Sequence, residues 1–290
     1  MMSRFFLMLF FLMFGFNWCY SQKNAKKNKA GKYKRIESVI VRENPNAKSR
    51  GASVSTGSFV SRDSLARLKA VFIVGPVESS TAEFIEEQKV AAAMLRAQGL
   101  QVVEVYSPFA NWELVKEKAK DAHILIYSGH GSTAGYDGKS GGFCLDDDII
   151  NASQIAGELQ LKKNALIVMN HVCRSAGSSA EDSKDIGVSV AKTRVNDYAK
   201  PFINLGSSAY FANNYTDCLS SFFSSFLERK KIEDIYRTEA EEWNKIEFIQ
   251  SLTDNPLYSI GISSTTMWSF KSYEIAFVGK PNFTIKDLFK

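Results

Sequence analysis

Two short polar segments of this sequence could carry nucleophilic chemistry, and each directly follows an apolar run. They are Ser128-Gly129-His130-Gly131 and Asn170-His171-Val172-Cys173. A thiolate nucleophile needs a nearby base or cation to lower the thiol pKa, and an imidazole can then act as general acid for the leaving group. His130 and Cys173 could therefore cleave an acyl bond, with Cys173 as the nucleophile.

The backbone beside the two side chains could stabilise the charge that forms in such a reaction. Glycines flank His130 on both sides and leave the backbone uncovered there. The N–H groups of Gly131 and Cys173 would then point at a developing oxyanion.

Each residue alone also has a plainer interpretation. A cysteine after an apolar strand is often a small core residue, and a histidine between glycines is often a loop residue. His130, His171 and Cys173 could also supply three zinc ligands, but no Cys-x-x-Cys or His-Glu-x-x-His spacing supports this. We expect no metal and no cofactor. We expect His171 to lie near Cys173 without a role that the pair requires, and His123 to lie at the opposite sheet edge.

The elements that would position these residues alternate between strands and helices. Apolar runs predict strands at 70–74, 101–106, 123–127, 165–169, 206–211 and 273–278, and helical spacing predicts helices at 80–99, 111–120, 219–226 and 232–248. Ser80 with Glu83, and Asn111, are expected to cap the first two helices, and Asp146 to Asp148 to cap the helix that follows them. The order predicts an α/β fold with a mainly parallel sheet flanked by helices. Ligands of such sheets bind outside the carboxyl ends of the strands, where His130 and Cys173 would lie.

The N-terminus has the pattern of an export signal. Arg4 is followed by twelve residues, Phe5 to Phe16, of which only Gly15 is not strongly apolar. This run is too short to span a bilayer, and small residues at Cys19 and Ser21 suit cleavage after Ser21. We expect residues 1–21 to be a signal peptide, the mature protein to be secreted or periplasmic, and no stable membrane span to remain.

Residues 22–67 predict a basic, flexible tail. Gln22 to Arg50 hold ten Lys and Arg against two acids, and the chain there has little apolar content to bury. The tail is either a propeptide, a contact to an anionic surface or a solvated linker. We expect residues 68–290 to form one domain and the protein to be a monomer.

Charge and cysteine count exclude two classes of protein. The net charge of the chain is +5, but residues 51–290 carry a net −4, so the folded part is mildly acidic and we expect no nucleic-acid partner. Only Cys144, Cys173 and Cys218 would remain after signal removal, which excludes a dense disulfide framework. Cys144 and Cys218 could pair, although a buried Cys144 thiol is the simpler account.

The two chemical segments together resemble the caspase-like clan of cysteine peptidases, in particular its gingipain, clostripain and CHAT branches. The likeness lies in the strand ending in Ser-Gly-His-Gly, followed by a second strand ending in a Cys. It extends over about residues 69–283 and includes similar segments at 142–151, 205–211 and 277–281. The resemblance implies a caspase-like three-layer sandwich and a cysteine endopeptidase with a His130/Cys173 dyad, oxyanion donors at Gly131 and Cys173, and a peptide or protein substrate.

The resemblance also nominates residues for the pocket of the substrate residue P1, which precedes the cleaved bond. These are Glu181, Asp182, Asp185, Ser207, Ser208 and Tyr210. An acid facing the pocket would select Lys or Arg at P1; otherwise the loop from Glu181 to Asp185 is only solvated. Val172 and Lys280 depart from the family pattern. A catalytically silent caspase-like module that binds a peptide or protein is therefore the alternative function.

Overall fold

The computed structural model describes residues 60–134, 139–216, 218–240, 245–250, 257–267 and 270–290, together with two short strands, β1 (Lys26–Lys27) and β2 (Tyr33–Lys34). The expected signal peptide and most of the expected tail lie outside the described residues. The packed chain begins before residue 68, because Leu65 of helix α2 (Arg62–Leu65) is buried in the core. Ser61 caps this helix by accepting a hydrogen bond from the Ser64 N–H. Residues 60–67 therefore belong to the domain.

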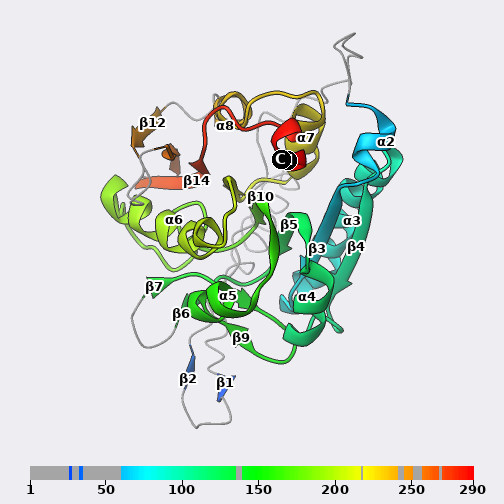
Figure 1. Ribbon diagram of the computed structural model, residues 1–290. Coiled ribbons are helices and arrows are strands. Elements are labelled where there is room, and N and C mark those ends of the chain that lie inside the picture. Colours follow the sequence, from blue (N-terminus) through cyan, green and yellow to red (C-terminus); the bar gives the residue numbers. More distant parts are fainter. Residues whose placement is uncertain are drawn as a thin grey trace, which may run out of the picture.

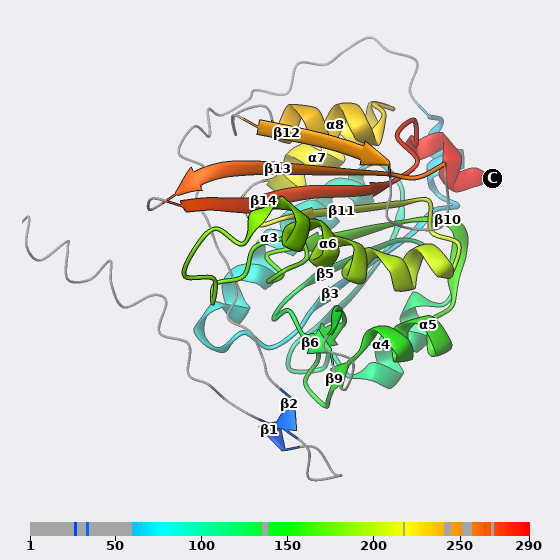
Figure 2. The same ribbon diagram turned by 90° about the vertical axis from the view of Figure 1, so that its left-hand side faces the viewer.

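One sheet of eight strands runs through the domain in the order β12-β13-β14-β11-β10-β5-β3-β4 (Figure 2). The neighbouring strands from β11 to β4 pair in parallel, and β12, β13 and β14 are added antiparallel. The parallel strands are β3 (Lys69–Val74), β4 (Gln101–Tyr106), β5 (Ala122–Ser128), β10 (Leu161–Asn170) and β11 (Ala209–Asn213). The antiparallel strands are β12 (Lys245–Gln250), β13 (Ser259–Met267) and β14 (Phe270–Gly279). The predicted α/β fold with a mainly parallel sheet is confirmed.

Helices cover both faces of the sheet and make a three-layer sandwich (Figure 1). One face packs against α4 (Trp112–Ala119), α5 (Ala152–Glu158) and α6 (Gly187–Asn204). The other packs against α3 (Thr81–Ala97), α7 (Cys218–Leu227) and α8 (Ile232–Ala240), with α2 and the final turn η3 (Ile285–Phe289) beside them. No helix in the described ranges is long and apolar enough to cross a membrane.

The apolar runs become central strands because both faces of these strands are covered. In β5, Leu125 and Tyr127 point into the core under α4 to α6, while Ile124 and Ile126 point into the core under α3, α7 and α8. Alternate side chains of a strand point to opposite faces, so a strand buried on both faces needs apolar residues at every position. The continuous runs recognised in the sequence are the consequence of this burial.

Short hairpins connect β5 to α5. They are formed by β6 (Thr133–Ala134) with β7 (Lys139–Ser140) and by β8 (Phe143–Cys144) with β9 (Ile149–Ile150). Asn151 and Gln154 form a capping box at the start of α5. Asp146 and Asp147 instead accept hydrogen bonds from the N–H groups of Ala110 and Trp112, at the start of α4. Asp146 and Asp147 therefore cap the earlier helix α4. We had expected them to cap the following helix, so this prediction is wrong.

Two further local predictions are wrong. The helix predicted over 232–248 ends at Ala240, and β12 follows because its backbone pairs with β13. Ser80 makes no side-chain capping bond; the Val77 N–H donates to Thr81 Oγ1 instead, at 2.7 Å. Asn111 does cap α4 as predicted. Cys144 and Cys218 form no disulfide with each other, and both side chains are buried.

Candidate active site

The ends of β5 and β10 bring the His130 and Cys173 segments together. The two strands are in register at their carboxyl ends, where Ser128 faces Asn170. A methyl group added to Gly131 would lie 2.2 Å from the carbonyl oxygen of Cys173, so the two backbones are in direct contact. The fold thus unites the two segments at the sheet edge where α/β proteins bind ligands.

Glu78, which the sequence analysis missed, contacts His130. It lies in the turn η1 (Glu78–Ser80) after β3, and its Oε2 is 2.9 Å from His130 Nε2. The Glu78 side chain is 66% exposed and that of His130 is 10% exposed. An exposed carboxylate adds little stability, but it selects one orientation of the ring and places Nε2 toward Glu78. Its position could have pointed to it, because Glu78 follows the carboxyl end of β3, the strand next to β5.

The backbone from His130 to Ser132 is held by side chains from β5, β8 and α6. Tyr127 Oη lies 3.0 Å from the carbonyl oxygen of His130, and Cys144 Sγ lies 4.0 Å from that of Gly131. The Ser132 N–H donates to Tyr198 Oη at 2.8 Å. The loop expected to supply an oxyanion donor is therefore fixed by buried groups.

Cys173 lies in a tight turn with unusual backbone angles on both sides. His171 and Arg174 have φ values of +56° and +69°, which residues other than glycine seldom adopt. The Ser175 N–H and hydroxyl both bond to the carbonyl oxygen of Val172, and Tyr210 Oη donates to that of Ser175 at 2.9 Å. Backbone strain of this kind concentrates at functional sites. Cys173 itself has no exposed surface, so a substrate reaches it only after neighbouring groups move.

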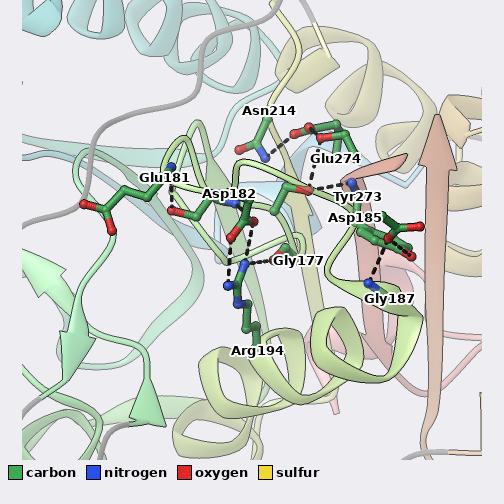
Figure 3. Close-up of polar contacts among 12 residues, drawn as sticks. Gly177, Glu181, Asp182, Asp185, Gly187, Arg194, Asn214, Tyr273 and Glu274 are labelled. Atoms are coloured by element: carbon green, nitrogen blue, oxygen red, sulfur yellow. Dashed lines mark hydrogen bonds and ion pairs between the residues drawn. The ribbon is translucent and has the colours of Figure 1, made fainter. Parts of the chain in front are cut away.

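Two of the acids nominated for the P1 pocket hold the loop after Cys173 in place (Figure 3). Asp182 makes a two-pronged ion pair with Arg194 at 2.7 and 2.9 Å, and Arg194 also donates to the Gly177 carbonyl. Asp185 accepts a hydrogen bond from the N–H of Gly187, the first residue of α6, at 2.8 Å. The charge of Asp182 is thus already compensated by Arg194, which argues against its predicted role. Glu181 lies on the same loop, and its N–H donates to Ser179 Oγ.

Ser207 and Ser208 lie away from Cys173, whereas Tyr210 lies against the Cys173 turn. The two serines precede β11 and lie at its amino end, whereas Cys173 lies beyond the carboxyl ends of the parallel strands. Ser208 Oγ bonds there to Asn164 and Lys280. Tyr210 is fully buried and supports the Cys173 turn through Ser175. The nomination of the serines is wrong, because they lie at the start of β11 whereas Cys173 lies beyond the ends of the parallel strands.

A buried acid on β14 lies beside the Cys173 loop instead. Glu274 is 1% exposed, accepts from Asn214 Nδ2 at 2.8 Å and is bonded by the Ser272 hydroxyl (Figure 3). Ser272 in turn bonds to Ser178, five residues after Cys173. Asn214 Oδ1 is buried and has no hydrogen-bond partner among the described residues. An acid within an otherwise apolar strand sequence, Tyr273 to Val278, was the signal available.

The zinc alternative does not fit the structure. The described residues include no group of three or more His, Cys, Asp and Glu side chains placed to hold a metal ion. His171 turns away from Cys173 toward α3, where its Nε2 is 2.8 Å from Glu87 Oε2. His123 lies near the start of β5 and accepts a bond from the Lys69 N–H, at the opposite edge as predicted.

Comparison of the chain with protein-family models, with curated proteins and with solved structures gave no match. The functional conclusion therefore depends on the residues and their geometry.

Proposed function

We propose that this protein is a secreted or periplasmic cysteine endopeptidase of the caspase-like type, in which Cys173 is the nucleophile and His130 the general acid and base. The observation that supports it is the convergence of three strand ends: Glu78 after β3, His130 after β5 and Cys173 after β10. A nucleophile, a base and a group that orients the base are the parts that covalent acyl transfer requires.

The reaction proceeds in two stages. His130 takes the proton of the Cys173 thiol, and the thiolate attacks the peptide carbonyl carbon. The N–H groups of Gly131 and Cys173 stabilise the resulting oxyanion. The C–N bond then breaks, the amine leaves with the proton from His130, and a thioester remains on Cys173. Water, deprotonated by His130, hydrolyses the thioester and restores the thiol.

We further propose Lys or Arg at P1, with Glu274 as the acid that selects it. With Asp182 paired to Arg194, Glu274 is the buried carboxylate bonded to the loop after Cys173. Asn214 Oδ1 adds a buried acceptor that lacks a donor among the described residues. A carboxylate and an amide oxygen side by side suit the several N–H donors of a guanidinium or ammonium group.

One observation favours the alternative of a silent module that binds a peptide or protein. Cys173 is fully buried and His130 is 8% exposed, so the described state is closed. A peptidase must open from this state, whereas a silent module need not expose Cys173 at all.

The test is cleavage of a peptide library by the mature protein beside Cys173→Ala and His130→Ala. We expect cleavage by the wild type and loss of at least about a thousandfold in each variant, with the double variant no worse because the two residues act as a unit. Circular dichroism and thermal unfolding show whether the variants fold. Library binding without cleavage, unchanged in Cys173→Ala, would support the silent module.

A further inference from the structure

Six polar side chains that the proposed reaction does not use form a buried cluster behind the site. We call it the α3 clamp, and it consists of Glu87, Gln88, Ser128, Asn170, His171 and Asn213. The side chain of Glu87 is 13% exposed and the other five residues are 0 to 1% exposed. Burying polar side chains costs free energy unless they are hydrogen-bonded, whereas apolar residues could fill the same space without that cost.

Helix α3 holds the ends of two strands through this cluster. Gln88 Nε2 donates to Ser128 Oγ at 2.8 Å, and Glu87 Oε2 accepts from Asn170 Nδ2 at 3.1 Å. The same Glu87 oxygen is 2.8 Å from His171 Nε2. Residues 87 and 88 share the sheet-facing side of α3 with Phe84, three and four positions earlier.

The clamp extends to a third strand and fixes an unusual backbone angle. Asn213 Nδ2, at the end of β11, donates to Asn170 Oδ1 at 2.8 Å, and the His171 N–H donates to the Asn213 carbonyl at 2.8 Å. The His171 ring stacks on Phe84 with centroids 5.0 Å apart. His171 is thus held on three sides in its strained conformation, at φ +56°.

Two residues of the α3 clamp lie close in sequence to the two catalytic residues. Ser128 is two positions before His130, and His171 is two positions before Cys173. The same helix α3 begins directly after the turn that carries Glu78. One helix therefore adjoins all three parts of the site.

The cluster is poorly built for stability. Glu87 Oε1, Gln88 Oε1 and His171 Nδ1 are buried without a hydrogen-bond partner among the described residues. Such groups lower stability, because a buried donor or acceptor without a partner keeps the cost of its removal from water. Polar networks of this kind can instead select a single geometry.

We propose that Glu87 and His171 are positioning residues, which hold the Cys173 turn at the distance from His130 that proton transfer requires. This role rests on the proposed peptidase function. A displacement of about 1 Å in a catalytic group can cost a factor of about 100 in rate, whereas substrate contacts made elsewhere are unaffected.

The test compares Glu87→Met and Glu87→Gln with Glu86→Met. Glu86 is the adjacent residue on α3, its side chain is 71% exposed, and Glu86→Met removes the same charge. We expect kcat of Glu87→Met, per folded molecule, to fall by about 10- to 100-fold with KM within about twofold. Glu87→Gln, whose amide oxygen still accepts from Asn170 and His171, should recover to within about threefold of wild type. Glu86→Met should match wild type. A folded Glu87→Met with wild-type kcat would refute the positioning role.

A second pair of variants decides the matter if Glu87→Met fails to fold. His171→Gln can still donate to Glu87, whereas the shorter His171→Asn cannot reach it, and asparagine tolerates the positive φ. We expect kcat close to wild type in His171→Gln and a fall of about tenfold or more in His171→Asn. Equal kcat in the two would refute the proposal. A wild type that cleaves no peptide, with Cys173 labelled by an electrophile no faster than Cys144, refutes the peptidase function, and the positioning role with it.

Discussion

Gly131→Ala should damage both the fold and the site, because Gly131 is where the His130 and Cys173 loops touch. The new methyl carbon would lie 2.2 Å from the Cys173 carbonyl oxygen and 2.8 Å from Tyr198 Oη. Ordinary contact begins at 3.4 Å, so the loops must separate by about 1.2 Å, and the nearest obstacle is backbone that cannot rotate away.

The size of the effect follows from this separation. Overpacking of a rigid site costs about 1–3 kcal/mol, and about 2 kcal/mol lowers the Tm of a domain of this size by roughly 4–8 °C. A shift of about 1 Å between nucleophile and base should lower kcat/KM by about 100-fold. Gly157→Ala is the matched control, since Gly157 lies in α5 and a methyl group there meets nothing within 4 Å.

The assay measures Tm by circular dichroism and kcat/KM on a cleaved peptide for both variants. Gly157→Ala should keep wild-type activity and match or exceed the wild-type Tm, because alanine favours a helix over glycine by up to about 1 kcal/mol. If Gly131→Ala had the Tm and kcat/KM of wild type, the contact between the two loops would be wrong, and with it the geometry of the site.

Three further predictions concern the residues around this contact. Glu78→Ala should lower kcat/KM by about tenfold with little change in Tm, since the 66% exposed carboxylate orients His130 without stabilising the fold. Glu83→Ala, at an exposed position, is the control. Equal kcat/KM in the two variants would show that Glu78 has no role in the site. Glu274→Gln should lower kcat/KM for substrates with Lys or Arg at P1 by about 100-fold and change kcat/KM for neutral P1 residues by no more than about threefold. The loop variant Glu181→Gln should keep the preference for basic P1 residues. The reverse pattern would assign P1 selection to Glu181. The basic tail should be cut after a Lys or Arg between Lys23 and Arg67 in the wild type but not in Cys173→Ala, because its sequence offers a basic residue at many positions. Mass analysis of the N-termini is the measurement, and an intact tail in both would leave it a linker.

The central strands and the two chemical segments could be predicted because their signals are local. Each buried strand is a continuous apolar run, and His130 and Cys173 directly follow such runs. The rule that ligands bind at the carboxyl ends of parallel strands then placed both residues at one edge. Their contact through Gly131 agrees with that prediction.

The partners of these residues could not be predicted, because they come from segments distant in the sequence. Glu78 is 52 residues from His130, and Glu87 is 84 residues from His171. The direction of β11 decides that Ser207 lies at the end of the strands opposite to Cys173. Backbone pairing with β13 decides that residues 245–250 form a strand. Such choices depend on tertiary pairing, which the local pattern does not contain.

The most direct test of the central claim is competitive labelling of the three cysteines by a peptide that carries a thiol-reactive electrophile, with the modified positions counted by mass spectrometry. All three are buried, at 2%, 0% and 6% exposure for Cys144, Cys173 and Cys218, so burial alone predicts similar rates. Burial and the nearby Glu239 also raise the pKa of the Cys218 thiol well above its usual range, which keeps it protonated. We predict that Cys173 reacts at least about a hundredfold faster than the other two and that His130→Ala abolishes this difference. Equal labelling of the three cysteines, or fast labelling of Cys173 that is unchanged in His130→Ala, would contradict the proposed dyad.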